Sequence, residues 1–224
     1  MNYLLTLSYD GTNYCGWQVQ PNGETIESML NRHLTELLKE EIHVIGASRT
    51  DSGVHADGNV AVFDTNARMP ADRISYAMNT RLPADIRIQD SCEVPPDFHA
   101  RYSCVGKRYQ YLIWNADGKN PFYRGRALEY WRPLDLEKLR PACEMFLGTH
   151  DFRGFCSAKA NLEDTVRTIR ELQVTREGDF VTLRIVGDGF LYNMVRIIMG
   201  TLVKWQVNHW TPESLQEVLL ACDR

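Results

Sequence analysis

The sequence predicts an α+β protein built from two split βαβ units, with a mostly antiparallel sheet and helices on one face. The first half reads as strand, helix, strand, strand, helix, strand, which is the split βαβ order of ferredoxin-like domains. The second half repeats that order without sequence identity to the first. At 224 residues, 44% hydrophobic and 24% charged, the chain is long enough to bury a core. We expect two domains, residues 1–103 and 104–224.

Residue types and spacing set the elements of the first half. Asp10 and Gly11 are turn residues that end a first strand. Apolar residues at helical spacing indicate a helix, β-branched residues indicate two short strands, and Pro70 suits the first turn of a second helix. We expect these elements at residues 2–9 (strand), 25–39 (helix), 42–45 and 60–63 (strands), 70–79 (helix) and 85–94 (strand).

The second half gives elements of the same kinds. Val181, Leu183 and Ile185 alternate with polar neighbours, as in a half-buried strand. We expect strands at residues 107–115, 168–175 and 180–186, and helices at 135–147, 190–203 and 212–220. The printed chain ends at Arg224 before a closing strand. We therefore expect either a shortened chain or a sheet edge that a partner covers, since open edges favour association.

Several classes of protein are disfavoured by composition. No segment has the apolar length that spans a bilayer, and the start MNYLLTLSYDG has no basic head. We therefore expect a cytoplasmic protein that does not enter the membrane, whose six cysteines are reduced and mostly buried. The histidines show no HExxH or other metal spacing, so we expect no metal and no cofactor.

The charge is unevenly distributed. A formal net charge of −4 argues mildly against nucleic acid as a partner. Between Arg101 and Arg132, however, seven basic residues face only two acidic ones. This segment is either a local basic face for phosphates or a solvated charged surface.

A polar stretch, SRTDSGVHADG (residues 48–58), separates the apolar runs IHVIG and NVAVF. A loop between two sheet strands holds side chains rigidly while exposing them. Asp51 is therefore a candidate catalytic carboxylate. The alternative is that Asp51 only caps a turn, because Asp51-Ser52-Gly53 is good turn chemistry.

A second candidate lies in GFLYNMVRIIMGTL, where Arg196 is surrounded by apolar residues. The pattern predicts a buried helix with Arg196 in its middle. Buried arginine is rare unless an anion pairs with it, and Asp51 is a candidate partner. The alternatives are a purely structural ion pair, or an Arg196 side chain that reaches the surface.

A third candidate is FHARYSCVGKRYQYLIWN (residues 98–115), where basic residues alternate with aromatic ones. Cations for phosphates and rings for stacking are typical of surfaces that bind RNA. We expect Tyr111 and Trp114 to be core residues, whereas Tyr109, flanked by Lys107 and Arg108, is a candidate for stacking on a base.

With these motifs together, the chain closely resembles the bacterial tRNA pseudouridine synthase A family. The likeness runs nearly end to end, through YDGTNYCGWQVQ, SRTDSGVHA, FHARYSCVGKRYQY, HDFRGF and GDGFLYNMVRIIMGTL. RTDxGVHA is highly specific, and five such segments occur in order. The family continues past this terminus into a closing strand, which fits the element expected to be missing.

The resemblance implies the pseudouridine synthase fold and the isomerisation of uridine in the anticodon stem-loop of tRNA, at positions 38–40. It implies a homodimer and no cofactor. It assigns Asp51 as catalytic residue, Tyr109 as the ring that stacks on the uracil, and Arg196 as the group that orients Asp51. Arg49 would contact RNA or support the loop, and phosphates would be held by Arg101, Lys107 and Arg108.

Two rival functions remain open on the sequence. Split βαβ sheets are common RNA platforms, so a non-catalytic RNA-binding module fits the basic and aromatic strand. Such a module has no need for Asp51 with a buried Arg196. A hydrolase that uses Asp51 as general base is the second rival, and it would release free uracil or cleave RNA.

Overall fold

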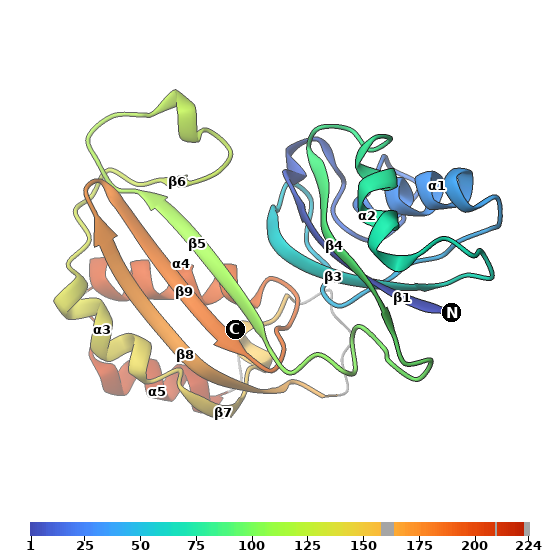
Figure 1. The fold of residues 1–224 in the computed structure, drawn as a ribbon. Helices are drawn as coiled ribbons and strands as arrows, with labels where there is room; N and C mark the ends of the chain where they lie inside the picture. The colour runs from blue at the N-terminus through green and yellow to red at the C-terminus, as the bar shows by residue number, and fades with distance from the viewer. Residues whose placement is uncertain (158–163, 209, 222–224) are drawn as a thin grey trace. The chain divides into compact units, whose positions relative to one another are not determined.

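The structure, a computed structural model, describes residues 1–157, 164–208 and 210–221. The chain divides into two compact units, Met1–Cys104 and Val105–Arg224. Hydrogen bonds group the strands into two sheets, one of four strands and one of five (Figure 1). The predicted α+β class is confirmed, with a separate sheet in each unit.

The first unit has an antiparallel sheet in the order β2-β3-β1-β4, the order of a split βαβ fold. Two helices cover one face of this sheet (Figure 1). The elements are β1 (Asn2–Tyr9), α1 (Ile26–Leu38), β2 (Ile45–Gly46), β3 (Ala56–Asp64), α2 (Ala71–Asn79) and β4 (Ile86–Val94), with a short 3-10 helix η1 (Gly11–Asn13) after β1.

Helix α1 shows how local signals set an element. Thr25 caps its N-terminus by accepting a hydrogen bond from the Ser28 N–H, and Ser28 reciprocates through its side chain. The apolar residues at helical spacing are buried against the sheet, and Lys39 ends the helix in a left-handed conformation with φ 61°. The expected helix at 25–39 is therefore correct within one residue at each end.

Strand β2 is shorter than expected and starts later, at Ile45. Ile42 and Val44 are buried, but their backbone N–H groups do not join the sheet. They donate instead to side chains of α1, Ile42 to Thr35 Oγ1 at 3.0 Å and Val44 to Asn31 Oδ1 at 2.8 Å. The apolar pattern of residues 42–45 correctly predicts that Ile42 and Val44 are buried. It does not predict whether they pair with a neighbouring strand.

The second unit has the strand order β6-β5-β9-β8-β7, with helices on one face (Figure 1). All its pairs are antiparallel except β5 with β6, which is parallel. The elements are β5 (Lys107–Trp114), β6 (Leu128–Glu129), α3 (Leu136–Glu144), β7 (Gly148–Asp151), β8 (Val166–Glu177), β9 (Phe180–Gly187), α4 (Met194–Val207) and α5 (Pro212–Ala221), with short 3-10 helices η2 (Pro121–Tyr123) and η3 (Arg153–Phe155).

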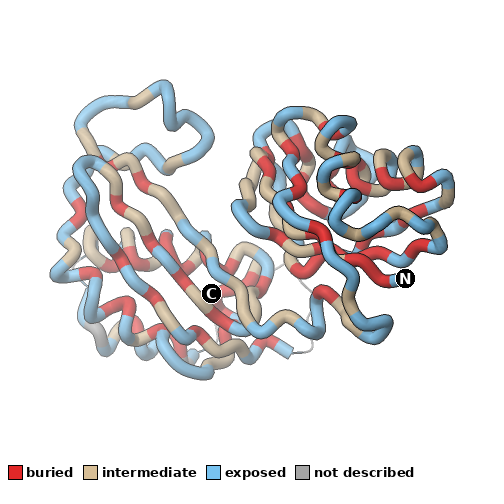
Figure 2. Tube along the Cα trace, in the orientation of Figure 1, coloured by how far each residue is buried: buried red, intermediate tan, exposed pale blue. Residues whose placement is uncertain are grey.

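Burial alternates along the central strands of this sheet (Figure 2). On β9, Val181, Leu183 and Ile185 face the helices and are buried, while Arg184 is exposed on the opposite face. The short strands β6 and β7 were not expected, because they hold too few apolar residues to show a period of two.

The cysteines depart from the expectation of mostly buried thiols. Cys143 and Cys156 are buried, Cys15 and Cys104 are half-buried, and Cys92 is exposed. Burial raises the pKa of the Cys143 thiol to about 12. Cys222 lies outside the described residues. Among the helices that the structure describes, none is both long and apolar enough to cross a membrane.

Candidate active site

Asp51 lies on the loop of residues 47–55, which joins β2 to β3 in the first unit. Asp51 is half-buried. We call residues 47–55 the Asp51 loop. The position of this loop between two strands was expected. Most of the groups that support it belong to residues 9–17, a segment far away in the chain.

Backbone hydrogen bonds hold the Asp51 loop on both sides of Asp51. The Trp17 N–H donates to the Thr50 carbonyl at 2.9 Å, and the Gly53 N–H donates to the Tyr14 carbonyl at 3.3 Å. Within the loop, the Val54 N–H donates to the Asp51 carbonyl at 3.1 Å. The backbone at Asp51 is therefore fixed by neighbours that belong to a different segment.

Side chains add to this support. The hydroxyls of Tyr9 and Thr50 are 2.8 Å apart, and Ser52 Oγ donates to the Tyr14 carbonyl at 3.3 Å. Buried Asn59 donates through Nδ2 to the Ser48 carbonyl at 3.0 Å. Leaving a buried polar group without a hydrogen bond costs free energy. These hydrogen bonds therefore favour one conformation of the loop.

The supporting segment is itself anchored to the core. Trp17 is 1% exposed and packs against Gly46, where an added Cβ would come within 2.4 Å of the indole. The Tyr14 hydroxyl donates to Asp85 Oδ1 at 2.6 Å. Burial, together with this hydrogen bond and the Asp85 charge, raises the pKa of Tyr14 above its ordinary value.

Close backbone approach between the two segments requires glycine. Gly16 has φ +83°, and a Cβ there would lie 2.6 Å from the Thr50 carbonyl oxygen. At Gly11, a Cβ would lie 2.1 Å from the Val54 carbonyl oxygen. The two glycines of DGTNYCG therefore permit the contact that holds the Asp51 loop.

We expect Gly16→Ala to lower the free energy of unfolding by about 2–4 kcal/mol, because it adds left-handed strain and a clash with Thr50. Urea unfolding at equilibrium measures this difference. Gly200→Ala in α4 is the matched control, since no atom lies within 4 Å of its added Cβ. Equal stabilities of the two variants would contradict the proposed backbone contact.

His55 ends the Asp51 loop and connects it to the turn after β1. Its Nδ1 atom lies 3.0 Å from Asp10 Oδ1 and 3.1 Å from the Gly11 N–H. One nitrogen cannot donate to the carboxylate and accept from the amide at once, so the tautomer decides which contact is favourable. Its Nε2 atom is buried and has no hydrogen-bond partner among the described residues. Sequence reasoning gave His55 no role.

The two basic residues of the first unit that were predicted to contact RNA, Arg49 and Arg101, are exposed. Arg49 lies two residues before Asp51 on the same loop. Arg101 lies in the turn of residues 99–103, where the Ser103 N–H donates to the His99 carbonyl at 2.8 Å. Both guanidinium groups are therefore accessible to solvent.

In the second unit, Tyr109 is half-buried on β5, opposite Ile185 of β9. Its ring meets Phe190 edge to face, with centroids 5.1 Å apart at 78°. Tyr111 was expected in the core; it is half-buried and packs against the core, as Tyr109 also does. Lys107 is half-buried and Arg108 is exposed at the start of the same strand.

Trp114 is not the core residue that was expected. It is half-buried and packs against Tyr123 and Phe180, with ring centroids at 5.8 and 5.0 Å. Alternation along β5 places it on the sheet face opposite the buried Ile113. The large apolar side chain of Trp114 suggested a core position, but it does not indicate which face of the sheet the residue occupies.

The prediction that Arg196 is buried is wrong. Helix α4 begins at Met194, after Asn193 at φ 62°, and Arg196 is exposed in its first turn. Arg196, Gly200 and Lys204 follow each other at a spacing of four and form an exposed stripe. The opposite side of the helix carries the buried residues Met194, Val195, Ile198, Met199, Leu202 and Trp205.

The predicted site residues belong to both units. Arg49, Asp51 and Arg101 lie in the first unit, and Lys107, Arg108, Tyr109 and Arg196 lie in the second. The pairing of Asp51 with Arg196 thus joins residues of different units, and it stays a prediction. Within the described ranges, no three His, Cys, Asp or Glu side chains are grouped so as to hold a metal ion.

Comparison with known proteins gives a consistent result. The sequence model of a family described as tRNA pseudouridine synthase matches residues 6–103 and 142–224. A tRNA pseudouridine synthase A from Acetivibrio thermocellus is 46% identical over 218 residues, covering 97% of this chain and 89% of that protein.

Two further relatives agree. A tRNA pseudouridine synthase A 2 from Clostridium perfringens is 43% identical over 223 residues, covering 100% of this chain and 91% of that protein. A tRNA pseudouridine synthase A from Halalkalibacterium halodurans is 43% identical over 221 residues, covering 98% and 84%. The similarity therefore extends over both units.

Proposed function

Because this chain belongs to the tRNA pseudouridine synthase family and is an isomerase of uridine in tRNA, we propose that it acts on the anticodon stem-loop, at positions 38–40, with Asp51 as its catalytic residue. The observation that carries the assignment of Asp51 is the loop that holds it. Backbone hydrogen bonds from Trp17 and to Tyr14 fix that loop on both sides of the carboxylate. Such fixed geometry suits a group that must meet one substrate atom.

The reaction exchanges one bond at the sugar for another. The C1′–N1 glycosidic bond of uridine breaks, the uracil turns, and C5 forms a new bond to C1′. C5 then loses its proton, and N1 gains one, so the product is an isomer of the substrate. The balance requires no oxidant, reductant or energy source.

Asp51 supplies the negative charge that this exchange needs. Cleavage of a glycosidic bond builds positive charge at C1′, as in glycoside hydrolysis. An ionised carboxylate stabilises that charge, attacks C1′ to form a covalent intermediate, or removes a sugar proton to give a glycal-like intermediate. All three routes require the carboxylate to be ionised and held beside the sugar.

Tyr109 is proposed to stack on the target base. A uridine within stacked RNA must leave the stack before an enzyme reaches its C1′ and C5 atoms. Tyr109 is half-buried, with Phe190 against its ring at 5.1 Å, so its ring orientation is restrained. A restrained ring offers a flat surface to the uracil at low entropic cost.

We expect Tyr109→Leu to lower kcat/KM by about 5- to 150-fold, because stacking contributes roughly 1–3 kcal/mol per base. Tyr109→Phe retains the ring and should lose much less. Steady-state kinetics on tRNA measures both, with Tyr76→Leu, an exposed tyrosine on α2, as the control. Wild-type kinetics for both Tyr109 variants would show that this ring does not touch the base.

The remaining assignments concern RNA and assembly. We propose that Arg196 orients Asp51, that Arg49 contacts RNA or supports its loop, and that Arg101, Lys107 and Arg108 hold phosphates. The exposure of Arg49, Arg101 and Arg108 supports their roles toward RNA, since phosphate contacts need accessible cations. We also propose that the protein works in the cytoplasm as a homodimer, for which sedimentation velocity is the test of assembly.

Tritium release tests the proposed function directly. In tRNA labelled at C5 of uridine, formation of the C5–C1′ bond displaces the label into water. Tritium release from tRNA that stays intact is the expected result. Because pseudouridine has the mass of uridine, the modified positions are located by mass spectrometry of digested tRNA after carbodiimide derivatisation, which adds mass to pseudouridine selectively. Binding without release would indicate an RNA-binding module, and free uracil or cleaved RNA would indicate a hydrolase.

A further inference from the structure

A loop of the second unit presents exposed aromatic rings among basic side chains. Residues 116–132 connect β5 to α3; they extend beyond the end of the sheet and return to it at the short strand β6, Leu128–Glu129 (Figure 1). Phe122 is 86% exposed and Trp131 is 68% exposed. The loop carries the basic residues Lys119, Arg124, Arg126 and Arg132 against the acidic Asp117 and Glu129. It is thus locally basic in a chain whose net charge is −4.

The base of this loop is held in place by packing. Tyr123 stacks on Trp114 at 5.8 Å and 17°, and it meets Phe180 edge to face at 4.5 Å. Trp114 also donates through Nε1 to the Gly118 carbonyl at 3.0 Å. Trp114 and Phe180, which lie outside the buried core of this unit, therefore support the base of the loop.

Hydrogen bonds hold the turn at Phe122 and join the two ends of the loop. Asn120 caps the turn at Phe122, whose N–H donates to Asn120 Oδ1 at 3.1 Å. Buried Asn115 donates through Nδ2 to the carbonyls of Tyr130 at 2.7 Å and Arg132 at 2.8 Å. The backbone that carries Phe122 is therefore held in an ordered turn while its ring is exposed, so little backbone entropy is lost when the ring binds a partner.

We propose that this loop, residues 116–132, is an RNA contact in which Phe122 and Trp131 stack on unpaired bases while Arg124 and Arg132 contact the adjoining phosphates. This inference rests on the proposed function for the identity of the RNA. Solvent-exposed rings interleaved with cations fit single-stranded nucleotides, because every base has a face for stacking and every nucleotide a phosphate. The guanidinium carbon of Arg132 already lies 5.2 Å from the Trp131 ring, which places a cation next to a stacking surface.

The loop lies outside the residues that the family model matches, 6–103 and 142–224. The inference therefore depends on the side chains of this chain and not on the shared motifs. A contact at this loop should affect the binding of RNA and leave the chemical step alone. It should also favour RNA with unpaired nucleotides over a blunt duplex.

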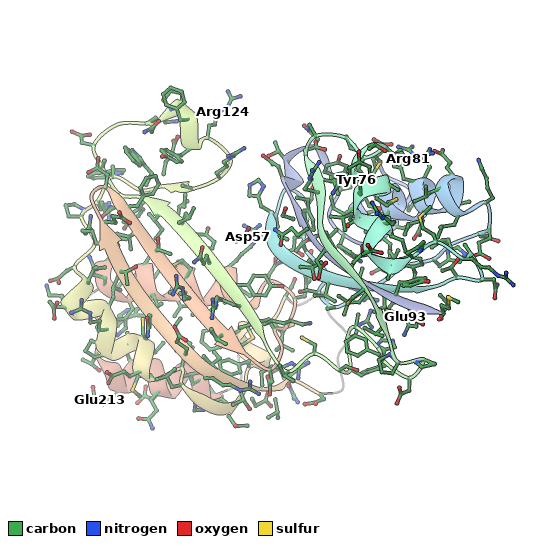
Figure 3. All side chains as sticks on the ribbon, viewed as in Figure 1. Asp57, Tyr76, Arg81, Glu93, Arg124 and Glu213 are labelled. Atoms are coloured by element: carbon green, nitrogen blue, oxygen red, sulfur yellow. The ribbon has the colours of Figure 1, made fainter. Side chains whose placement is uncertain are left out.

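The test measures kcat and KM for full-length tRNA by tritium release, with Phe122→Ala and Arg124→Ala compared with Tyr76→Ala and Arg81→Ala. The controls are an exposed tyrosine and an exposed arginine of the first unit (Figure 3). We expect Phe122→Ala to raise KM about tenfold with kcat unchanged. Arg124→Ala should raise KM at low salt and reduce the slope of log KM against log salt by about 0.7, the effect of one phosphate contact on single-stranded RNA. Both control variants should match the wild type.

Binding of labelled RNA separates this proposal from the proposed function. The wild type should bind a stem with an unpaired loop more tightly than a blunt duplex, and Phe122→Ala should lose most of that preference. If the wild type releases no tritium, the isomerase assignment fails while the binding comparison still tests the loop. Unchanged KM and unchanged RNA binding in both loop variants would overturn the proposal. A change in sedimentation with unchanged KM would overturn it too, since it would identify a second copy of the chain as the partner.

Discussion

Asp51→Asn should reduce kcat for tritium release by at least about 10³-fold, because the substitution removes the only negative charge proposed to act at C1′. Asparagine has nearly the shape of aspartate but cannot carry charge, attack the sugar or remove a proton. The change therefore separates the chemistry of the carboxylate from its packing. We expect the affinity for tRNA to change by less than about threefold.

The fold of the Asp51→Asn variant should survive. The hydrogen bonds between the Asp51 loop and residues 14–17 use backbone atoms and the side chain of Ser52. Asp57→Asn is the matched control, since Asp57 is an exposed aspartate six residues farther along the chain (Figure 3). The control should be fully active, and wild-type turnover by Asp51→Asn would remove Asp51 from the mechanism.

Arg196→Met should lower kcat by about 10²-fold, which is the order of loss expected when a catalytic group is displaced by about 1 Å. The guanidinium is proposed to fix the direction of the Asp51 carboxylate through charge-assisted hydrogen bonds. Removing the cation also disfavours the ionised form of Asp51. The acid limb of the pH–rate profile should consequently move to higher pH.

Two further variants isolate the role of Arg196. Lys204→Met removes another exposed cation from the same stripe of α4 and should leave both rate and pH profile unchanged. Arg196→Lys retains the charge but loses the planar fork, so its activity should fall between wild type and Arg196→Met. Because Arg196 is exposed, its replacement should change the free energy of unfolding by less than about 0.5 kcal/mol. A wild-type pH profile for Arg196→Met would contradict the pairing.

The elements that the sequence predicted well are those whose burial has a clear period. Helix α1 combines an N-cap at Thr25 with one apolar face, and both signals are local. Strand β3 starts at Ala56, earlier than expected, because its first residues include the exposed Asp57 and Gly58. Strand β3 therefore pairs over more residues than the apolar segment 60–63 that predicted it.

Arg196 shows where composition misled. The run GFLYNMVRIIMGTL is apolar in total, and this suggested a helix buried on every side. The helix starts only at Met194, and Arg196 and Gly200 then lie on the side away from the core. The average hydrophobicity of this segment conceals the helical alternation of buried and exposed residues. That alternation becomes visible once the first residue of the helix is known.

The support of the Asp51 loop was not predictable from spacing. Ser52 and Tyr14 are 38 residues apart, and neither Gly11 nor Gly16 carries a signal that names its partner. The motif identified Asp51 as a candidate, and the structure adds the reason that its backbone is fixed. Close approach of two backbones is a tertiary property that only coordinates reveal.

The central claim is that the Asp51 carboxylate acts at the sugar, beside C1′, of a uridine held outside the RNA stack. The most direct measurement is a crystal structure of the Asp51→Asn variant bound to unreacted tRNA. We predict a distance of about 3–3.5 Å between a side-chain atom at position 51 and C1′ of the target uridine, as a reacting pair requires. A target uridine still stacked in the RNA, or a C1′ atom beyond about twice that distance, would contradict the account.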